Sequence, residues 1–387
     1  MNVSLLLRME IIRGGIQLLE RYGHGGDLRS ATELYGMEED RLLDFSSNMN
    51  PLGPPQVVAE ILSQYMQHIT KYPDPVSRQL REALASRHQI RADEVLVGNG
   101  AAELIDLIVR YYEPKTAAIV APSFIEYEQA LQKSDCEITY IESNAEDGFT
   151  PNEQQIDELI EQQSIELYML GHPNNPTGQL LREQTVTKLL QSGAIVVLDE
   201  AFLDFHQDED ELSWISNINT NSNLFVIRSM TKFYSIPGIR LGYIVGPEQS
   251  IQEMKHMQYP WSVNSLAQSI GQAVLQEHSF ARQTKAWLIE ETQWMYDQLQ
   301  ALQLKPFRTV TNYILVDLAY GYNITAAALQ HLMGMQGVLI RDASTFRGLG
   351  ASYIRLAIKS RQQNIEVLRV LAANLASYRK GADDELQ

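Results

Sequence analysis

The feature of this sequence that most restricts its fold is an alternation of short apolar runs with longer helical patterns between residues 95 and 245. Several runs are continuously apolar, such as AIVVL at 194–198, which is typical of strands buried on both faces. The alternation predicts an α/β fold with a mainly parallel, seven-stranded sheet between helices. The expected strands are 95–97, 117–121, 137–141, 166–170, 194–198, 224–228 and 242–245, and the expected helices are 101–112, 124–133, 153–163 and 180–191.

The pattern changes after about residue 262, where long helical stretches dominate. They cover 262–302 and 361–379, and strand-like pieces at 313–317 and 353–358 interrupt them. We interpret this part as a second, smaller α+β domain. The predicted organisation is an N-terminal arm over 1–50 that contributes to the small domain and the active site, a large domain over 51–270, and a C-terminal small domain over 271–387.

Composition excludes several classes of protein. The 387 residues include 31 Lys and Arg against 48 Asp and Glu, and the net charge of −17 argues against general nucleic-acid binding. No apolar run approaches the ~18 residues that a membrane helix needs. The single cysteine, Cys136, excludes an internal disulfide framework and fits a reducing compartment, so we expect a cytoplasmic protein.

Two segments with charged residues are expected to have no role beyond the fold. Arg8 and Glu10 interrupt the apolar stretch near the N-terminus, which predicts a short helix before Tyr22 instead of a secretory signal. The acidic run at 204–211 is expected to be a solvated loop. The histidines show no metal-ligand spacing, and no metal is predicted.

Four segments at the carboxyl ends of the expected strands carry groups that can react or bind a ligand. In open α/β sheets, ligands bind at this edge. Taken alone, each has a plain structural reading, since glycine, proline and asparagine form turns and an acid can cap a helix. Together they supply an amine, a carboxylate, amides and a cradle of hydroxyls, helix N–H groups and an arginine. That set matches the needs of pyridoxal phosphate (PLP). The segments are GNGAAE at 98–103, HPNNPTG at 172–178, DE at 199–200 and SMTKFYSIPGIRLG at 229–242.

The motifs HPNNPTG, VVLDEAF and SMTKFYSIPGIRLGY, between about 172 and 243, resemble those of the fold type I PLP enzymes, in the class I/II aminotransferase branch. The likeness covers nearly the whole chain. It implies PLP as cofactor, Lys232 as the lysine bonded to it, Asp199 as the partner of the ring nitrogen and Asn175 as a donor to the ring 3′-oxygen. The remaining cofactor contacts that it implies are Gly100, Ala101, Ala102, Ser229, Thr231 and Arg240 around the phosphate, and Phe124 stacked on the ring.

The resemblance also implies a homodimer and a residue that binds the substrate. Tyr72 in KYPDP is similar to the tyrosine that a neighbouring subunit lends to the cofactor phosphate, and Arg355 in YIRLAIKS to the arginine that binds a substrate α-carboxylate. Two groups of the family compete, the L-threonine-O-3-phosphate decarboxylases of cobalamin biosynthesis and the histidinol-phosphate aminotransferases. Phe202 in DEAF, HGG at 24–26 and SSNMNPLGPP at 46–55 favour the decarboxylases.

The expected partner is therefore a small phosphorylated amino acid. Candidates for its phosphate are His24, Ser47, Asn48 and Arg341, while Arg347 is either a third anion contact or a loop residue. The sequence departs from the decarboxylase pattern at Asp27, where asparagine is more common. Phe202 lacks the hydroxyl with which a tyrosine would reach the cofactor ring. A non-catalytic, PLP-binding regulatory protein is the remaining alternative.

Overall fold

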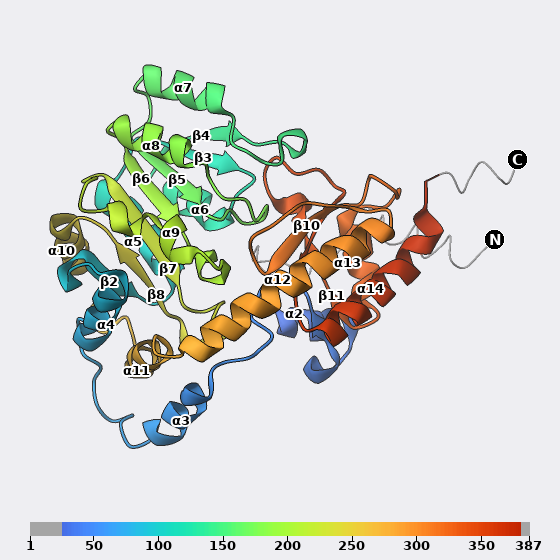
Figure 1. The fold of residues 1–387 in the computed structure, drawn as a ribbon, viewed down its shortest axis with the longest axis horizontal. Coiled ribbons are helices and arrows are strands. Elements are labelled where there is room, and N and C mark those ends of the chain that lie inside the picture. Colours follow the sequence, from blue (N-terminus) through green and yellow to red (C-terminus); the bar gives the residue numbers. More distant parts are fainter. Residues whose placement is uncertain (1–24, 381–387) are drawn as a thin grey trace, which may run out of the picture.

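The computed structural model describes residues 25–380, so the helix expected before Tyr22 and the candidate residue His24 lie outside the described residues. Figure 1 shows a large sheet flanked by helices and, beside it, a second lobe with smaller sheets, with the long helix α12 (His278–Ala301) extending between them. Within residues 25–380, no helix is both long enough and apolar enough to cross a membrane. The domain boundaries given above stay a prediction.

The large sheet has seven strands in the order β2-β8-β7-β6-β5-β3-β4 among the described residues. The neighbours from β7 to β4 pair in parallel, and β8 is antiparallel to both β2 and β7. Every expected strand is present, with ends within one residue of the predicted ones, and the α/β prediction is confirmed. The strands are β2 (Val95–Gly98), β3 (Thr116–Ala121), β4 (Glu137–Glu142), β5 (Leu167–Gly171), β6 (Ile195–Asp199), β7 (Leu224–Ser229) and β8 (Gly242–Val245).

Both faces of this sheet are covered because successive strand residues point to opposite sides. Leu96 and Val197 pack in a core with α5, α6 and α10, whereas their neighbours Val97 and Leu198 belong to a second core with α4, α8 and α11. The helices of this lobe are α3 (Gln56–Tyr65), α4 (Arg78–His88), α5 (Ala101–Tyr112), α6 (Ile125–Gln132), α7 (Glu153–Glu161), α8 (Glu183–Gln191), α9 (Glu209–Leu212), α10 (Glu248–Met257) and α11 (Ser265–Val274).

The second lobe is built on a four-stranded antiparallel sheet in the order β12-β13-β10-β9. The helical stretch expected over 262–302 divides into α11 and α12, which bury their apolar residues against different parts of the molecule. Apolar spacing alone does not reveal such a change of direction. The other elements here are α2 (Leu28–Tyr35), β9 (Lys305–Pro306), β10 (Tyr313–Asp317), α13 (Ala326–Gly334), β11 (Val338–Leu339), β12 (Arg341–Asp342), β13 (Tyr353–Ala357) and α14 (Arg361–Leu375).

The second lobe also includes a segment from early in the chain. Strand β1 (Leu43–Asp44) pairs in parallel with β11, so that Leu43 lies opposite Val338. The backbone N–H of Ala357 then donates to the carbonyl of Phe45 at 2.9 Å. Residues 43–45 are thereby fixed beside β13, and the residues that follow them enter the space between the lobes.

The acidic run at 204–211 is only in part the solvated loop that its charge predicts, because Asp208, Asp210 and Glu211 are exposed whereas Asp204 and Glu209 face a buried arginine. Phe205 is buried, and Glu209 is 8% exposed. The cause is Arg228 on β7, a fully buried guanidinium that donates to Glu200 at 2.9 Å and lies 3.3 Å from Asp204 and 3.5 Å from Glu209. A buried cation requires anionic partners, and the run supplies two of them.

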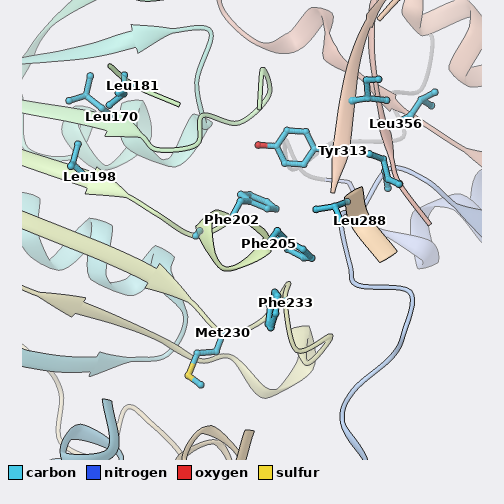
Figure 2. Packing of buried hydrophobic residues seen from close by; sticks show 14 of the residues in the cluster. Leu170, Leu181, Leu198, Phe202, Phe205, Met230, Phe233, Leu288, Tyr313 and Leu356 are labelled. Carbon is cyan, nitrogen blue, oxygen red and sulfur yellow. The ribbon is translucent and has the colours of Figure 1, made fainter. Parts of the chain in front are cut away.

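Aromatic side chains join the two lobes beneath the strand ends. Figure 2 shows Phe202 and Phe205, which follow β6, close to Phe233 and to Tyr313 of β10. The rings of Phe202 and Tyr313 pack edge to face with their centres 4.9 Å apart, and those of Phe205 and Phe233 with their centres 5.2 Å apart. This packing fixes the segments that carry Asp199 and Lys232 against the second lobe.

Candidate active site

A cavity of about 480 Å³ lies at the carboxyl ends of the strands, between the two lobes. It brings together nearly all the described residues that the sequence singles out. Tyr72 is the exception, and it does not line the cavity. The predicted residues that line it are Ser47, Asn48, Gly100, Ala101, Ala102, Phe124, Asn175, Asp199, Ser229, Thr231, Lys232, Arg240, Arg341 and Arg355.

Lys232 presents a desolvated amine to this cavity. Its Nζ donates to the Ser229 hydroxyl at 3.4 Å and lies 5.8 Å from the centre of the Phe202 ring. Burial lowers the pKa of Lys232, and the negative charge of Asp199 opposes this shift only in part. A lowered pKa increases the neutral fraction of the amine, which is the form that attacks a carbonyl carbon.

Asp199 ends β6 as a buried carboxylate held on both oxygens. Oδ2 accepts from the Tyr127 hydroxyl at 2.7 Å, and Oδ1 accepts from the backbone N–H of Ala201 at 2.9 Å. Burial raises the pKa of Asp199, while the hydrogen bond from Tyr127 acts in the opposite direction. A cation in the cavity, such as a protonated ring nitrogen, would favour the ionised carboxylate.

The groups at the N-terminus of α5 fit a phosphate. Gly100 precedes the helix with φ +86°, a backbone conformation that favours glycine, and the Arg240 guanidinium lies directly against it. The hydroxyls of Ser229 and Thr231 lie 2.8 Å apart beside it. Helix N–H groups, two hydroxyls and an arginine form a donor set of the kind that binds the phosphate of PLP.

Two buried arginines face the other side of the cavity from adjacent strands. Arg341 of β12 and Arg355 of β13 are directly opposite in the antiparallel register, with 4% and 6% of their surfaces exposed. Like charges in this arrangement repel. Arg355 donates to the Asn175 side-chain oxygen and, at 3.0 Å, to the Ser46 carbonyl. Because the Asn175 oxygen accepts from Arg355, its amide hydrogens are the groups left to donate.

The glycines of the HGG motif reach the edge of the same cavity. Gly25 lines it, and a Cβ on this residue would lie 2.4 Å from the Ser46 carbonyl oxygen. Gly26 donates its backbone N–H to the Ser46 hydroxyl at 2.9 Å. Asp27 caps α2 by accepting from the Ser30 backbone at 3.0 Å, which gives the departure from the family pattern a structural role.

Several cavity residues were not predicted from the sequence. Tyr127 holds Asp199, and the cavity edge also includes Glu126, Glu128 and Tyr140. Tyr127 follows Phe124 at helical spacing in APSFIEY, a signal that could have placed both on one face of α6. Arg347 lines the cavity as well.

The comparisons with known proteins define the family. The sequence profile named "Aminotransferase class I and II" matches residues 40–371, and the chain belongs to this family of PLP-dependent enzymes. It is 37% identical to the threonine-phosphate decarboxylase of Salmonella typhimurium over 90% of this chain and 95% of the relative. It is 30% identical to the histidinol-phosphate aminotransferase of Methanothermobacter thermautotrophicus over 93% and 96%.

The fold does not distinguish these two groups, because a solved structure from each superposes on this chain. The L-threonine-O-3-phosphate decarboxylase from Porphyromonas gingivalis does so with a TM-score of 0.76 at 28% identity, over 86% of this chain and 98% of that structure. The histidinol-phosphate aminotransferase from Clostridium acetobutylicum superposes with a TM-score of 0.80 at 27% identity, over 86% of this chain and 99% of that structure. The choice between the activities therefore depends on individual residues in the cavity.

His172, the first residue of HPNNPTG, should make the protein sensitive to acid. It is buried, its Nδ1 accepts from the Leu181 backbone at 3.1 Å, and Nε2 lies 3.2 Å from the Leu212 carbonyl, to which it donates. Burial lowers the pKa of His172 from 6.5 to about 4. The unfolded chain binds a proton more readily, so this contribution to stability is complete above pH 6.5 and disappears as the pH falls towards 4, a loss of about 3 kcal/mol.

The measurement is urea unfolding of wild type and His172→Gln at intervals between pH 7 and pH 4. The free energy of unfolding of the variant should fall less steeply with acidification than that of the wild type. The exposed His256→Gln should keep the wild-type slope. Equal slopes for wild type and His172→Gln would contradict the prediction.

Proposed function

We propose that this protein decarboxylates L-threonine O-3-phosphate to (R)-1-amino-2-propanol O-2-phosphate, a reaction of cobalamin biosynthesis. The observation that carries the proposal is the pair of buried arginines, Arg341 and Arg355, directly opposed across two strands of one cavity. Such a pair suits a substrate with two anionic groups, here a phosphate and an α-carboxylate. The higher identity to the Salmonella decarboxylase than to the Methanothermobacter aminotransferase supports the same choice.

The residues around the cavity divide between cofactor and substrate. Lys232 would bond to PLP, Asp199 would hold its ring nitrogen, and the donor set around Gly100 would bind its phosphate. When bound, PLP supplies an electron sink that stabilises negative charge on the substrate Cα. The side-chain amide of Asn175, oriented by Arg355, would donate to the ring 3′-oxygen, and Phe202 contributes only an apolar surface where a tyrosine would donate.

The outcome of the reaction depends on which bond of the substrate Cα the protein aligns for cleavage. We propose that Arg355 binds the α-carboxylate, and that Arg341 binds the phosphate with help from Ser47, Asn48 and His24. Holding both ends fixes the orientation of Cα between them. Carbon dioxide would then leave and the bonding electron pair would stay on Cα. Lys232, protonated by the ammonium group of the incoming substrate, would return a proton there.

The second candidate is histidinol-phosphate aminotransferase activity. The high TM-score with the Clostridium enzyme favours it, and the groups assigned here to the cofactor would serve it equally. A non-catalytic regulatory protein has less support, because both the lysine and the acid of the cofactor site are present.

A product assay on purified protein with added PLP tests the proposal. One tube receives L-threonine O-3-phosphate alone, and another receives histidinol phosphate with 2-oxoglutarate. The expected result is carbon dioxide and aminopropanol phosphate in the first tube and no glutamate in the second. Glutamate without carbon dioxide would overturn the proposal in favour of the aminotransferase.

We also propose a homodimer in which Tyr72 reaches the neighbouring site. Tyr72 is 83% exposed, with its ring 5.0 Å from that of Trp261, and Met66, Ile69 and Tyr259 are exposed as well. Exposed apolar side chains in such number are typical of a surface that another chain covers. The cytoplasmic location likewise stays a prediction.

A subunit-mixing experiment tests this arrangement. Lys232→Ala and Tyr72→Ala should each be nearly inactive alone. A mixed dimer contains one site with its own Lys232 and a Tyr72 from the other subunit, so mixing the two variants after mild dissociation should restore activity. A monomeric mass in solution, or no recovery on mixing, would contradict the shared site.

A further inference from the structure

A cluster at the edge of the cavity, formed by Glu128, Tyr140 and Arg347, joins the two lobes through a charged contact. Glu128 belongs to α6 and Tyr140 to β4, both in the large-sheet lobe, whereas Arg347 lies in the segment between β12 and β13 of the second lobe. All three side chains line the cavity. This Arg347 cluster is not part of the cofactor and substrate contacts assigned above.

Arg347 is held by two contacts that leave it partly accessible. Its Nη2 donates to Glu128 Oε1 at 3.1 Å, and its guanidinium lies 3.9 Å from the centre of the Tyr140 ring. The Arg347 side chain is 53% exposed and that of Glu128 only 15%. A half-exposed ion pair is held weakly, because water screens the attraction.

Glu128 has a second partner that could keep it satisfied without Arg347. Gln132, one turn further along α6, donates its side-chain Nε2 to Glu128 Oε1 at 3.1 Å. Release of Arg347 would therefore leave the Glu128 carboxylate with a donor. Moving Arg347 from Glu128 to a bound anion therefore leaves no buried carboxylate without a hydrogen-bond donor on the large-sheet lobe.

The segment that carries Arg347 is also tied to the proposed phosphate site. Arg341, six residues earlier, donates to the Thr345 hydroxyl at 3.3 Å, and both of these residues line the cavity. Gly348 follows Arg347 with φ +85°, a conformation that glycine adopts without strain. Arg347 therefore lies on the same short segment as Arg341, the arginine proposed to bind the phosphate.

We propose that Arg347 is an exchangeable anion ligand, which Glu128 holds when the substrate is absent and which moves to the substrate phosphate when it binds. Glu128 acts as a competing carboxylate, and only a group of greater negative charge displaces it. The pair thus selects a phosphate over a carboxylate at this end of the substrate. This inference rests on the proposed function, because it takes the anion near Arg341 to be the phosphate of the substrate.

The test is calorimetric binding of inorganic phosphate to the PLP-loaded enzyme, in which the cofactor already fills its own phosphate site. Removing the competitor in Glu128→Gln should tighten phosphate binding about five- to tenfold, and Arg347→Gln should weaken it about tenfold. In the double variant the gain from Glu128→Gln should disappear. Glu142→Gln, an exposed acid on β4 outside the cavity, shows how much of the gain comes from removing any nearby negative charge.

The outcomes separate this inference from the proposed function. Weaker phosphate binding by Glu128→Gln would mean that Arg347 is a fixed contact, and it would overturn the exchange. A gain that persists in the double variant, or that Glu142→Gln reproduces, would overturn it too. No phosphate binding by the wild-type holoenzyme would instead contradict the phosphate side of the proposed function itself.

Discussion

Replacing Lys232 with alanine should abolish the visible absorbance of the protein-bound cofactor and lower kcat/KM by at least about a thousandfold. The physical reason is that we propose this amine, whose pKa is lowered by burial, as the nucleophile of the cavity. The same group would also return the proton to the substrate Cα. Absorbance spectra after gel filtration and a carbon dioxide assay would measure the two effects.

The matched control for this variant is Lys188→Ala, because PLP reacts with surface amines as well. The Lys188 side chain is 40% exposed and pairs with Asp157 at 2.8 Å, and Lys188 does not line the cavity. It should keep both absorbance and activity. Visible absorbance retained by Lys232→Ala and lost from Lys188→Ala would remove Lys232 from its assigned role.

Replacing Arg341 with glutamine should lower kcat/KM for L-threonine O-3-phosphate about a hundredfold, chiefly through KM, because a buried charged contact to the phosphate is lost. The slow reaction with unphosphorylated L-threonine should change about threefold at most. Arg355→Gln should instead impair both substrates, since both have the α-carboxylate. Steady-state kinetics with the two substrates measure this difference.

Thermal unfolding provides the control for the arginine variants. Arg341 and Arg355 are directly opposed and repel each other, so removing either charge should not lower Tm through lost attraction between the pair. An equal loss with both substrates in Arg341→Gln, at unchanged Tm, would contradict its assignment to the phosphate. An equal loss together with a large fall in Tm would contradict the expectation that the fold tolerates the change.

Most of the large sheet could be predicted because buried parallel strands give continuous apolar runs bounded by turn residues. The run at 194–198 is an example, and it became β6 (Ile195–Asp199). Strands β1, β11 and β12 have two residues each, too few to show any period, and only tertiary pairing defines them. Asp204 and Glu209 of the acidic run were misread as solvated because their partner, Arg228, is hidden within a strand.

The location of the proposed cofactor residues around one cavity could be predicted because they follow strand ends in compact motifs. The structure adds relations between segments that are far apart in the chain. Arg355 holds Asn175, 180 residues away, and Arg347 contacts Glu128, 219 residues away. Such pairs leave no local pattern, and Tyr127 and Glu128 look like ordinary residues of an amphipathic helix.

The pairing of β1 with β11 imposes an order on the synthesis and folding of the chain. The large sheet is formed from residues between 95 and 245, and these could assemble while later residues are still on the ribosome. Leu43 can pair with Val338 only after Val338 has left the ribosome. Because the loop that this pairing closes is long, many local contacts form before it. The Ser46 carbonyl meets Arg355 only after that closure. The side of the cavity that we propose to bind the substrate is therefore completed last, after the side that we propose to bind the cofactor.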